Sequence, residues 1–308
     1  MSRPRLFVAF VVCTVHAPAW ADPTPPVTLA PSLAVEPGVQ PIHWNPAWGT
    51  AVRWPELVFT GVAIGAAIAG QAIPPIGTGW RGSIGFDEDV RSAVRLDSEP
   101  ERRLARDYSD VLLTSLVGFP IIMDAMVVAG WARQSSDVAK EMLMMDAEVF
   151  AVTMAIQGLT NTLVHRERPY VVGCGTELPA NTQDCDGSTR GRSFFSGHTA
   201  ASFAAAALIC THQFNLDLYQ NPEMGGVVCA SSFLLAGTTG ALRIAGDVHN
   251  LSDVLVGAAV GTLVGFGLPW FFHYRHGDID DPPETSASTE PTLRLSPMGL
   301  GLSASGSF

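Results

Sequence analysis

The chain has 308 residues, 47% of them hydrophobic, and a net charge of −11 with a pI near 5.1. This length suits one sizeable domain with tails. The acidic balance argues against nucleic acid as a partner, because a phosphate backbone is bound by clustered Lys and Arg. It also argues against electrostatic capture by anionic lipid surfaces.

The first 21 residues have the pattern of an export signal. Two arginines precede an apolar run at 6–15, and Ala19-Trp20-Ala21 fits a small-x-small cleavage site. We therefore predict an exported protein that begins at Asp22. The alternative is an N-terminal membrane anchor, although the apolar run is short for one.

Pro-rich residues 22–55 predict a weakly ordered leader. The domain is predicted at 56–276, and 277–308 form a linker and C-terminal tail. The linker is acidic and rich in Pro, Ser and Thr. The Gly-rich end, 292–308, alternates apolar residues in part, which favours a strand or hairpin; a disordered tail is the alternative.

Six apolar segments are typical of helices, and no strand-like alternation or repeat separates them. We predict an all-α fold, a bundle of about six core helices with a pocket at one end. The segments are Leu57–Ile73, Val111–Gly130, Leu143–Val164, Thr199–Phe214, Gly225–Ala245 and Leu251–Phe272.

The stretch before the second segment is charged. Ser98 followed by Glu101 indicates a helix start. Five charged residues share the turns that follow, and we interpret them as a solvent-exposed helix face. They are Arg102, Arg103, Arg106, Asp107 and Asp110.

Several segments are long enough to cross a membrane, but Asp124, Asp146 and Glu148 lie within them. In lipid such groups are costly unless they face the bundle interior. If the signal is cleaved and all six segments span, Arg168 lies on the cytoplasmic side. Either Leu57–Ile73 does not span, or the bundle is periplasmic; we favour a periplasm-facing site with membrane association.

Three short motifs together predict a phosphate pocket. Two arginines offer planar forks to phosphate oxygens, and a helix N-terminus offers free backbone N–H groups. A histidine and a carboxylate four residues apart share one helix face, where the carboxylate can orient the ring. The motifs are Arg168-Pro169, Ser196-Gly197-His198, and Arg243 followed by His249 and Asp253.

At these residues the chain resembles the type 2 phosphatidic acid phosphatase superfamily, which includes bacterial acid phosphatases and vanadium haloperoxidases. The family spacing holds throughout. The resemblance implies that His249 is the nucleophile, that Asp253 orients it and that His198 is the general acid. It implies phosphate binding by Arg168, Ser196, Gly197 and Arg243, with no metal or other cofactor in the phosphatase members.

Three positions depart from the family pattern. Asn161 replaces a lysine, Phe195 a proline and Leu242 a serine. Loss of the lysine removes a cation from the predicted phosphate site. Arg166 can compensate only if the helix ends near His165, which the nearby Pro169 favours.

The cysteines agree with export. Cys174 and Cys185 flank a polar stretch and can close a loop beside the site in an oxidising compartment. Cys210 and Cys229 lie in apolar segments, where they are either buried thiols or a second disulfide.

The predicted function is hydrolysis of phosphate monoesters through a phosphohistidine. The substrate is a lipid phosphate, a pyrophosphate or a soluble ester, and vanadate is an expected inhibitor. One alternative is a vanadate-dependent haloperoxidase, in which vanadate is the cofactor. Another is a non-catalytic envelope protein that keeps the fold.

Overall fold

The computed structural model describes residues 40–76, 79–275, 292–298 and 301–307. The predicted signal peptide, most of the predicted leader and the predicted linker lie outside the described residues.

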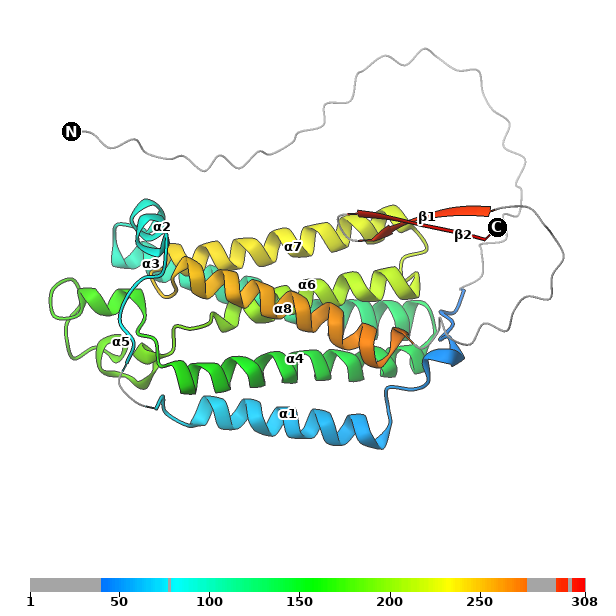
Figure 1. Ribbon diagram of the computed structural model, residues 1–308, viewed down its shortest axis with the longest axis horizontal. Coiled ribbons are helices and arrows are strands. Elements are labelled where there is room, and N and C mark those ends of the chain that lie inside the picture. Colours follow the sequence, from blue (N-terminus) through cyan, green and yellow to red (C-terminus); the bar gives the residue numbers. More distant parts are fainter. Residues whose placement is uncertain (1–39, 77–78, 276–291, 299–300, 308) are drawn as a thin grey trace, which may run out of the picture. The chain divides into compact units, whose positions relative to one another are not determined.

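Six long helices run side by side (Figure 1), in agreement with the predicted all-α bundle. The predicted segments were right in position. Two of them began late, at 111 instead of 99 and at 143 instead of 136, and the other ends agree to within three residues. The helices are α1 (Trp54–Ala72), α3 (Glu99–Gly118) with its π-helical continuation η2 (Phe119–Ala132), α4 (Ser136–Val164), α6 (Gly197–Leu216), α7 (Pro222–Ala245) and α8 (Leu251–Phe272).

Shorter elements connect the long helices. They are η1 (Pro46–Trp48), α2 (Asp87–Val94), η3 (Pro169–Gly173), α5 (Gln183–Asp186) and η4 (Ser188–Gly191). Near the C-terminus, β1 (Thr292–Met298) and β2 (Gly301–Ser307) form an antiparallel hairpin. The predicted hairpin is therefore present.

Helix α3 begins as predicted. The Ser98 hydroxyl accepts a hydrogen bond from the Glu101 N–H, and the Glu101 carboxylate accepts one from the Ser98 N–H, which is a capping box. The charges that follow are not all solvated. Arg102 is 3% exposed and Arg106 is largely buried, so the predicted solvent-exposed face is wrong for these two residues.

Helix α6 is the centre of the bundle and packs against α3, α4, α7 and α8. Its alanines from Ala204 to Ala207 have no exposed surface. Small side chains let the neighbouring helices approach closely. The disulfide Cys210–Cys229, left open by the sequence, ties α6 to α7.

Three glycines of α8, spaced four apart, face α6. An added Cβ would lie 2.7 Å from the Ser196 carbonyl oxygen at Gly257, 2.1 Å from the Ala200 oxygen at Gly261, and 2.5 Å from the Ala204 oxygen at Gly265. This glycine row therefore sets the distance between α6 and α8.

The ionisable groups inside the apolar helices face the bundle interior, as predicted for groups at membrane depth. Asp124, Asp146 and Glu148 are at most 1% exposed. Tyr219 donates its hydroxyl hydrogen to Asp124, whereas His212 pairs with Asp146 at 3.1 Å. Each carboxylate therefore has a polar partner.

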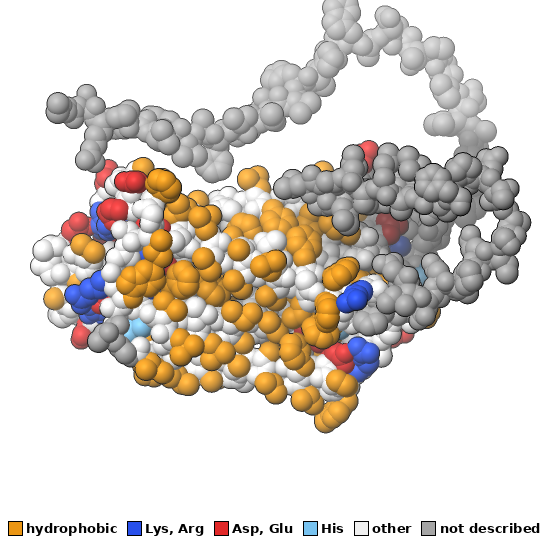
Figure 2. All heavy atoms as spheres, viewed as in Figure 1, with side chains coloured by type: hydrophobic (Ala, Val, Ile, Leu, Met, Phe, Trp, Pro, Cys, Tyr) orange, Lys and Arg blue, Asp and Glu red, His pale blue; other side chains and the backbone are white. Residues whose placement is uncertain are grey.

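Five helices of the described chain are long and apolar enough to cross a membrane: α1, α3 with η2, α4, α7 and α8. The suggestion that Leu57–Ile73 is the segment that does not span is not supported, because α1 meets these criteria and the buried α6 does not. Figure 2 shows hydrophobic side chains along the helices and charged ones gathered near their ends. This distribution is typical of membrane association.

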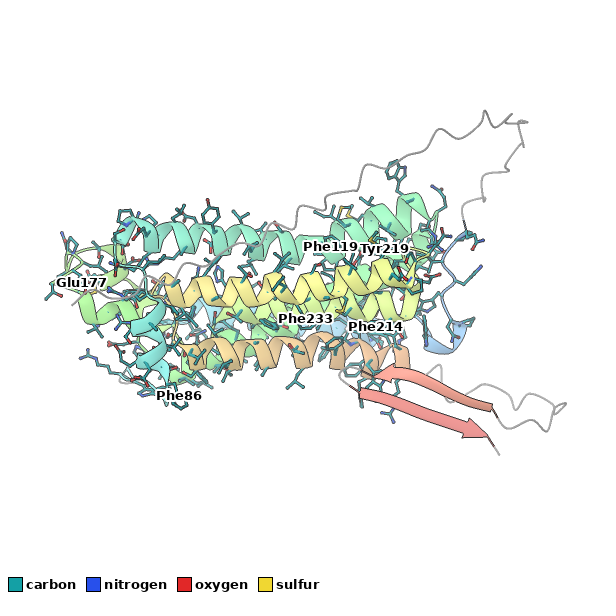
Figure 3. All side chains as sticks on the ribbon, turned by 90° about the horizontal axis from the view of Figure 1, so that it is seen from above. Phe86, Phe119, Glu177, Phe214, Tyr219 and Phe233 are labelled. Carbon is teal, nitrogen blue, oxygen red and sulfur yellow. A yellow bond between two sulfur atoms is a disulfide. The ribbon has the colours of Figure 1, made fainter. Side chains whose placement is uncertain are left out.

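The connectivity places the start of α1 and the end of α8 at the same end of the bundle. Six lengthwise passes separate Trp54, where α1 begins, from Phe272, where α8 ends. The turns 165–196 and 246–250 lie at the opposite end. Figure 3 shows Glu177 of the first turn far from Tyr219, which lies in the connection between α6 and α7.

The glycine row generates a stability prediction. We expect Gly261→Ala to lower the free energy of unfolding by about 1–3 kcal/mol, because the added methyl group overlaps the Ala200 carbonyl. Thermal unfolding in detergent measures this. Gly267→Ala on the same helix is the matched control, because its added Cβ would meet nothing within 4 Å. Equal melting temperatures would contradict the account.

Candidate active site

The predicted phosphate-site residues come together at one end of the bundle. Helix α4 ends at Val164, and His165 has a left-handed backbone with φ of 46°. The helix therefore ends near His165, which was the condition for Arg166 to compensate for the missing lysine. Arg168 has an extended backbone with ψ of 150°, as expected for a residue before proline.

A disulfide closes the loop that follows. Cys174 and Cys185 are bonded, as predicted, with their Cα atoms 5.7 Å apart. Asp184, next to Cys185, accepts a hydrogen bond from Arg106 at 3.2 Å. This contact connects the disulfide loop to helix α3.

The Ser-Gly-His motif opens helix α6. Ser196 is the N-cap, and its hydroxyl oxygen lies 3.4 Å from the Thr199 nitrogen. Gly197 and His198 occupy the first turn and line a cavity of about 250 Å³ together with Arg168 and His249. The free N–H groups of this turn thus lie beside the two histidines.

His249 is held in one tautomer. Its Nδ1 lies 2.8 Å from the backbone oxygen of Ser193. A carbonyl oxygen only accepts, so Nδ1 carries the hydrogen and Nε2 keeps its lone pair. Asp253, the residue predicted to orient the ring, is 3.8 Å from Nδ1, which is too long for a hydrogen bond.

The Asp253 carboxylate instead organises the surrounding backbone. It accepts hydrogen bonds from Arg166 at 2.5 Å, from the Ser193 hydroxyl at 2.6 Å and from the Asn250 N–H at 2.8 Å. Since Ser193 also receives the His249 hydrogen bond, Asp253 orients the histidine through this residue and through its charge.

Arg166 does not line the site. It has no exposed surface and pairs with Asp253 and, at 2.8 Å, with Asp87. Its guanidinium also lies 4.5 Å from the centre of the Trp80 ring. The suggestion that Arg166 replaces the missing lysine as a phosphate ligand is therefore wrong for this geometry.

Asn161 lines neither of the two cavities that Arg168 and His198 share. Its side chain is buried, and its amide nitrogen donates to the Gln157 carbonyl one turn earlier at 3.2 Å. Its side-chain oxygen has no hydrogen-bond partner among the described residues. A phosphate contact from Asn161 itself therefore stays a prediction.

His198 and Arg243 share a carboxylate that the motifs did not include. Asp110 of α3 accepts from His198 Nε2 at 2.7 Å and from Arg243 Nη1 at 3.1 Å. Because an ionised carboxylate only accepts, His198 carries its hydrogen on Nε2. The sequence analysis correctly placed Asp110 on an exposed helix face, where its side chain is 58% exposed, but gave it no partner at the site.

The two motif arginines have unused donors. Arg168 and Arg243 line one cavity of about 640 Å³ with His198 and Asp110. The Nε atoms of both arginines are buried and have no hydrogen-bond partner in the described part of the chain. Burial lowers the pKa of the Arg168 guanidinium. An anion in this cavity would satisfy both groups.

Comparison with known proteins agrees with the resemblance that the motifs carry. The family model described as PAP2 superfamily matches residues 146–277, which contain all three motifs.

One curated relative is a lipid A 1-phosphatase from Porphyromonas gingivalis, 42% identical over 77 residues. The alignment covers 25% of this chain and 16% of the relative, so the similarity concerns one segment of a longer protein. No solved structure matches the chain.

The environment of His249 generates a pH prediction. Burial, supported by the charges of Arg168 and Arg243, lowers its pKa from 6.5 to about 4. An unfolded histidine binds a proton near pH 6.5, so the ring destabilises the folded protein progressively as pH falls from about 6.5 to 4. Ring NMR, assigned with His249→Gln, should show a neutral imidazole down to about pH 4. Titration near 6.5 would contradict this environment.

The buried position of Arg166 generates a second prediction. Arg166→Met leaves two buried carboxylates without their cation, which costs about 3–5 kcal/mol of stability. Thermal unfolding in detergent provides the measurement. Arg81→Met is the control, because the Arg81 side chain is 75% exposed and its ion pair with Glu167 contributes at most about 1 kcal/mol. Similar losses of stability in both variants would contradict the role of Arg166 as the cation that neutralises two buried carboxylates.

Proposed function

We propose that the protein hydrolyses phosphate monoesters through a phosphohistidine at His249. The observation that carries this proposal is the buried imidazole with its free Nε2 beside two arginines that have unused donors. The family match and the name of the curated relative support the same reaction class.

In the proposed first step, the Nε2 lone pair of His249 attacks phosphorus and the bond to the ester oxygen breaks. His198, which must enter this step as the doubly protonated imidazolium, donates its Nε2 proton to the leaving alkoxide and becomes neutral imidazole. Arg168, Arg243 and the backbone N–H of Gly197 stabilise the charge on the other phosphate oxygens. Water then attacks the phosphohistidine, His198 takes up its proton, and inorganic phosphate leaves.

The same proposal requires no metal or organic cofactor. The cationic side chains supply the charge that a metal would supply in other phosphatases. Vanadate, which resembles phosphate in shape and charge, is expected to inhibit by occupying the same cavity.

We further propose that the ester is a lipid phosphate. An apolar groove of about 220 Å³ lies between α3 and α7, whose residues Asp110 and Arg243 line the phosphate cavity. Its wall includes Leu112 and Leu116 of α3 and Leu235 of α7. An acyl chain in this groove would extend from the phosphate along the apolar faces of both helices.

The proposed location is a periplasm-facing site on a membrane-associated protein. The Cys174–Cys185 disulfide beside the site supports an oxidising compartment. If all six passes crossed the membrane, residue 54 would lie on the side opposite the site, and a cleaved export signal would then put the site in the cytoplasm. The proposal therefore requires a bundle that associates with the membrane without crossing it six times. Protease cutting of the 174–185 loop in intact spheroplasts would support the proposal; cutting only after lysis would overturn it.

Phosphate release by the purified protein in mild detergent with a chelator tests the reaction. We expect turnover of a lipid phosphate and of a soluble aryl phosphate, with the lipid preferred. His249→Ala should lower kcat to below about one thousandth of the wild-type value. His43→Ala at an exposed position is the control and should retain activity.

Two results would redirect the assignment. Bromination with added vanadate and peroxide, without phosphatase activity, would support the haloperoxidase alternative. A folded protein that neither releases nor binds phosphate would support the non-catalytic envelope protein.

A further inference from the structure

The site lacks the motif lysine, yet the described structure brings a third arginine to the same cavity. Arg106 of α3 lines the 640 Å³ cavity together with Arg168 and Arg243. Its Nη2 is buried and has no hydrogen-bond partner among the described residues. Each of these three arginines therefore has an unused, buried N–H donor. Arg103 also lines the cavity, but its side chain is 71% exposed.

Other contacts hold the rest of the Arg106 side chain in place. Its Nε donates to the Gly246 carbonyl at 2.8 Å, and its Nη1 donates to Asp184 at 3.2 Å. The guanidinium also lies 5.5 Å from the centre of the Tyr170 ring. These contacts come from the α7–α8 turn and the disulfide loop, so the unused Nη2 has a fixed direction.

Gly246 makes this arrangement possible. A Cβ at position 246 would lie 2.9 Å from Cγ of Arg106, although the backbone φ of −75° is ordinary for any residue. The glycine is thus needed for space and not for conformation. It allows the arginine to pack against the turn that leads to His249.

Of the three guanidiniums, that of Arg168 has no close anionic partner. Arg106 pairs with Asp184 and, at 3.8 Å, with Glu99, and Arg243 pairs with Asp110, whereas no ion pair is found for Arg168 in the described part of the chain. Asp110 is also the partner of His198. Three like charges around one cavity repel one another, and a phosphate dianion would remove this repulsion.

We propose that Arg106 is a third phosphate-binding cation of this site and takes the role of the lysine that Asn161 replaces. This inference rests on the proposed phosphatase function and adds a binding residue from a helix outside the three motifs. Its Nη2 donates to a phosphate oxygen that Arg168 and Arg243 leave unbound.

Two other arginines near the site are already engaged. Arg166 pairs with two buried carboxylates. Arg192 donates through both Nη atoms to the carbonyl oxygens that end α1, those of Gly70, Gln71 and Ile73. Besides Arg168 and Arg243, Arg106 is therefore the arginine of the described chain that lines this cavity with a buried, unused donor.

Orthophosphate binding to the full protein in detergent tests this role separately from turnover. Calorimetry gives the Kd, and inhibition of aryl phosphate hydrolysis gives Ki. We expect Arg106→Met to weaken both at least tenfold, which corresponds to about 1.4 kcal/mol. Arg106→Lys keeps the charge and should recover part of the loss.

Arg103→Met is the matched control, because Arg103 lies on the same helix and also lines this cavity but has no buried, unused donor among the described residues. The Arg103 side chain is 71% exposed and lies 3.9 Å from Glu99, so its loss should change phosphate affinity less than about threefold. The decisive variant is Asn161→Lys in the Arg106→Met background. A lysine at the family position should restore phosphate affinity without restoring the contacts to Gly246 and Asp184.

The outcomes separate the two proposals. If the wild-type protein neither binds orthophosphate nor hydrolyses aryl phosphate, the phosphatase function fails. If the wild-type protein does both and Arg106→Met binds phosphate equally well, only the role of Arg106 fails. If Arg106→Met loses affinity and melting temperature together, and Asn161→Lys restores neither, Arg106 is a structural residue and the inference is overturned.

Discussion

The active-site end of the bundle depends on one buried ion cluster. Arg166 bridges Asp253 at the start of α8 and Asp87 at the start of α2, and all three side chains are at most 1% exposed. Burial alone would raise the pKa of the Asp87 carboxyl, but the hydrogen bonds from Arg166 and two backbone N–H groups keep it below its usual range. Removing one partner from such a cluster leaves an uncompensated buried charge, which strongly destabilises the fold.

This cluster connects the fold to the chemistry. Asp253 bonds the Ser193 hydroxyl, and the Ser193 carbonyl receives the hydrogen bond from His249. The position of Arg166 therefore determines, through three hydrogen bonds, which nitrogen of His249 faces the cavity. A guanidinium that the sequence suggested as a substrate ligand instead orients His249.

The sequence predicted the six helices and the motif residues, because apolar length and motif spacing are local properties. It did not predict the role of Arg106 or Asp110. Their charges lie at helical spacing, which is equally typical of a solvated face. Packing of α3 against the α7–α8 turn buries most of Arg106, whereas Asp110 stays 58% exposed while it pairs with His198 and Arg243. The acceptor for His249 was also missed, because a backbone carbonyl leaves no signal in the side-chain pattern.

The sequence also carries a signal for the close packing of α6 and α8. Gly257, Gly261 and Gly265 recur every four residues, a pattern typical of closely packed helices in membranes. The sequence could not show that the glycine face is directed at Ala200 and Ala204 of α6. That contact places the N-terminus of α6 beside His249, because both helices begin at the site.

Direct detection of the phosphorylated enzyme tests the central claim. Rapid quenching of the protein with radiolabelled aryl phosphate, followed by peptide mass spectrometry under alkaline conditions, locates the phosphoryl group. The account predicts an acid-labile, alkali-stable phosphoryl group on His249 that forms and decays within a turnover. A phosphoryl group on another residue, or turnover with no phosphoenzyme in pre-steady-state sampling, would contradict it.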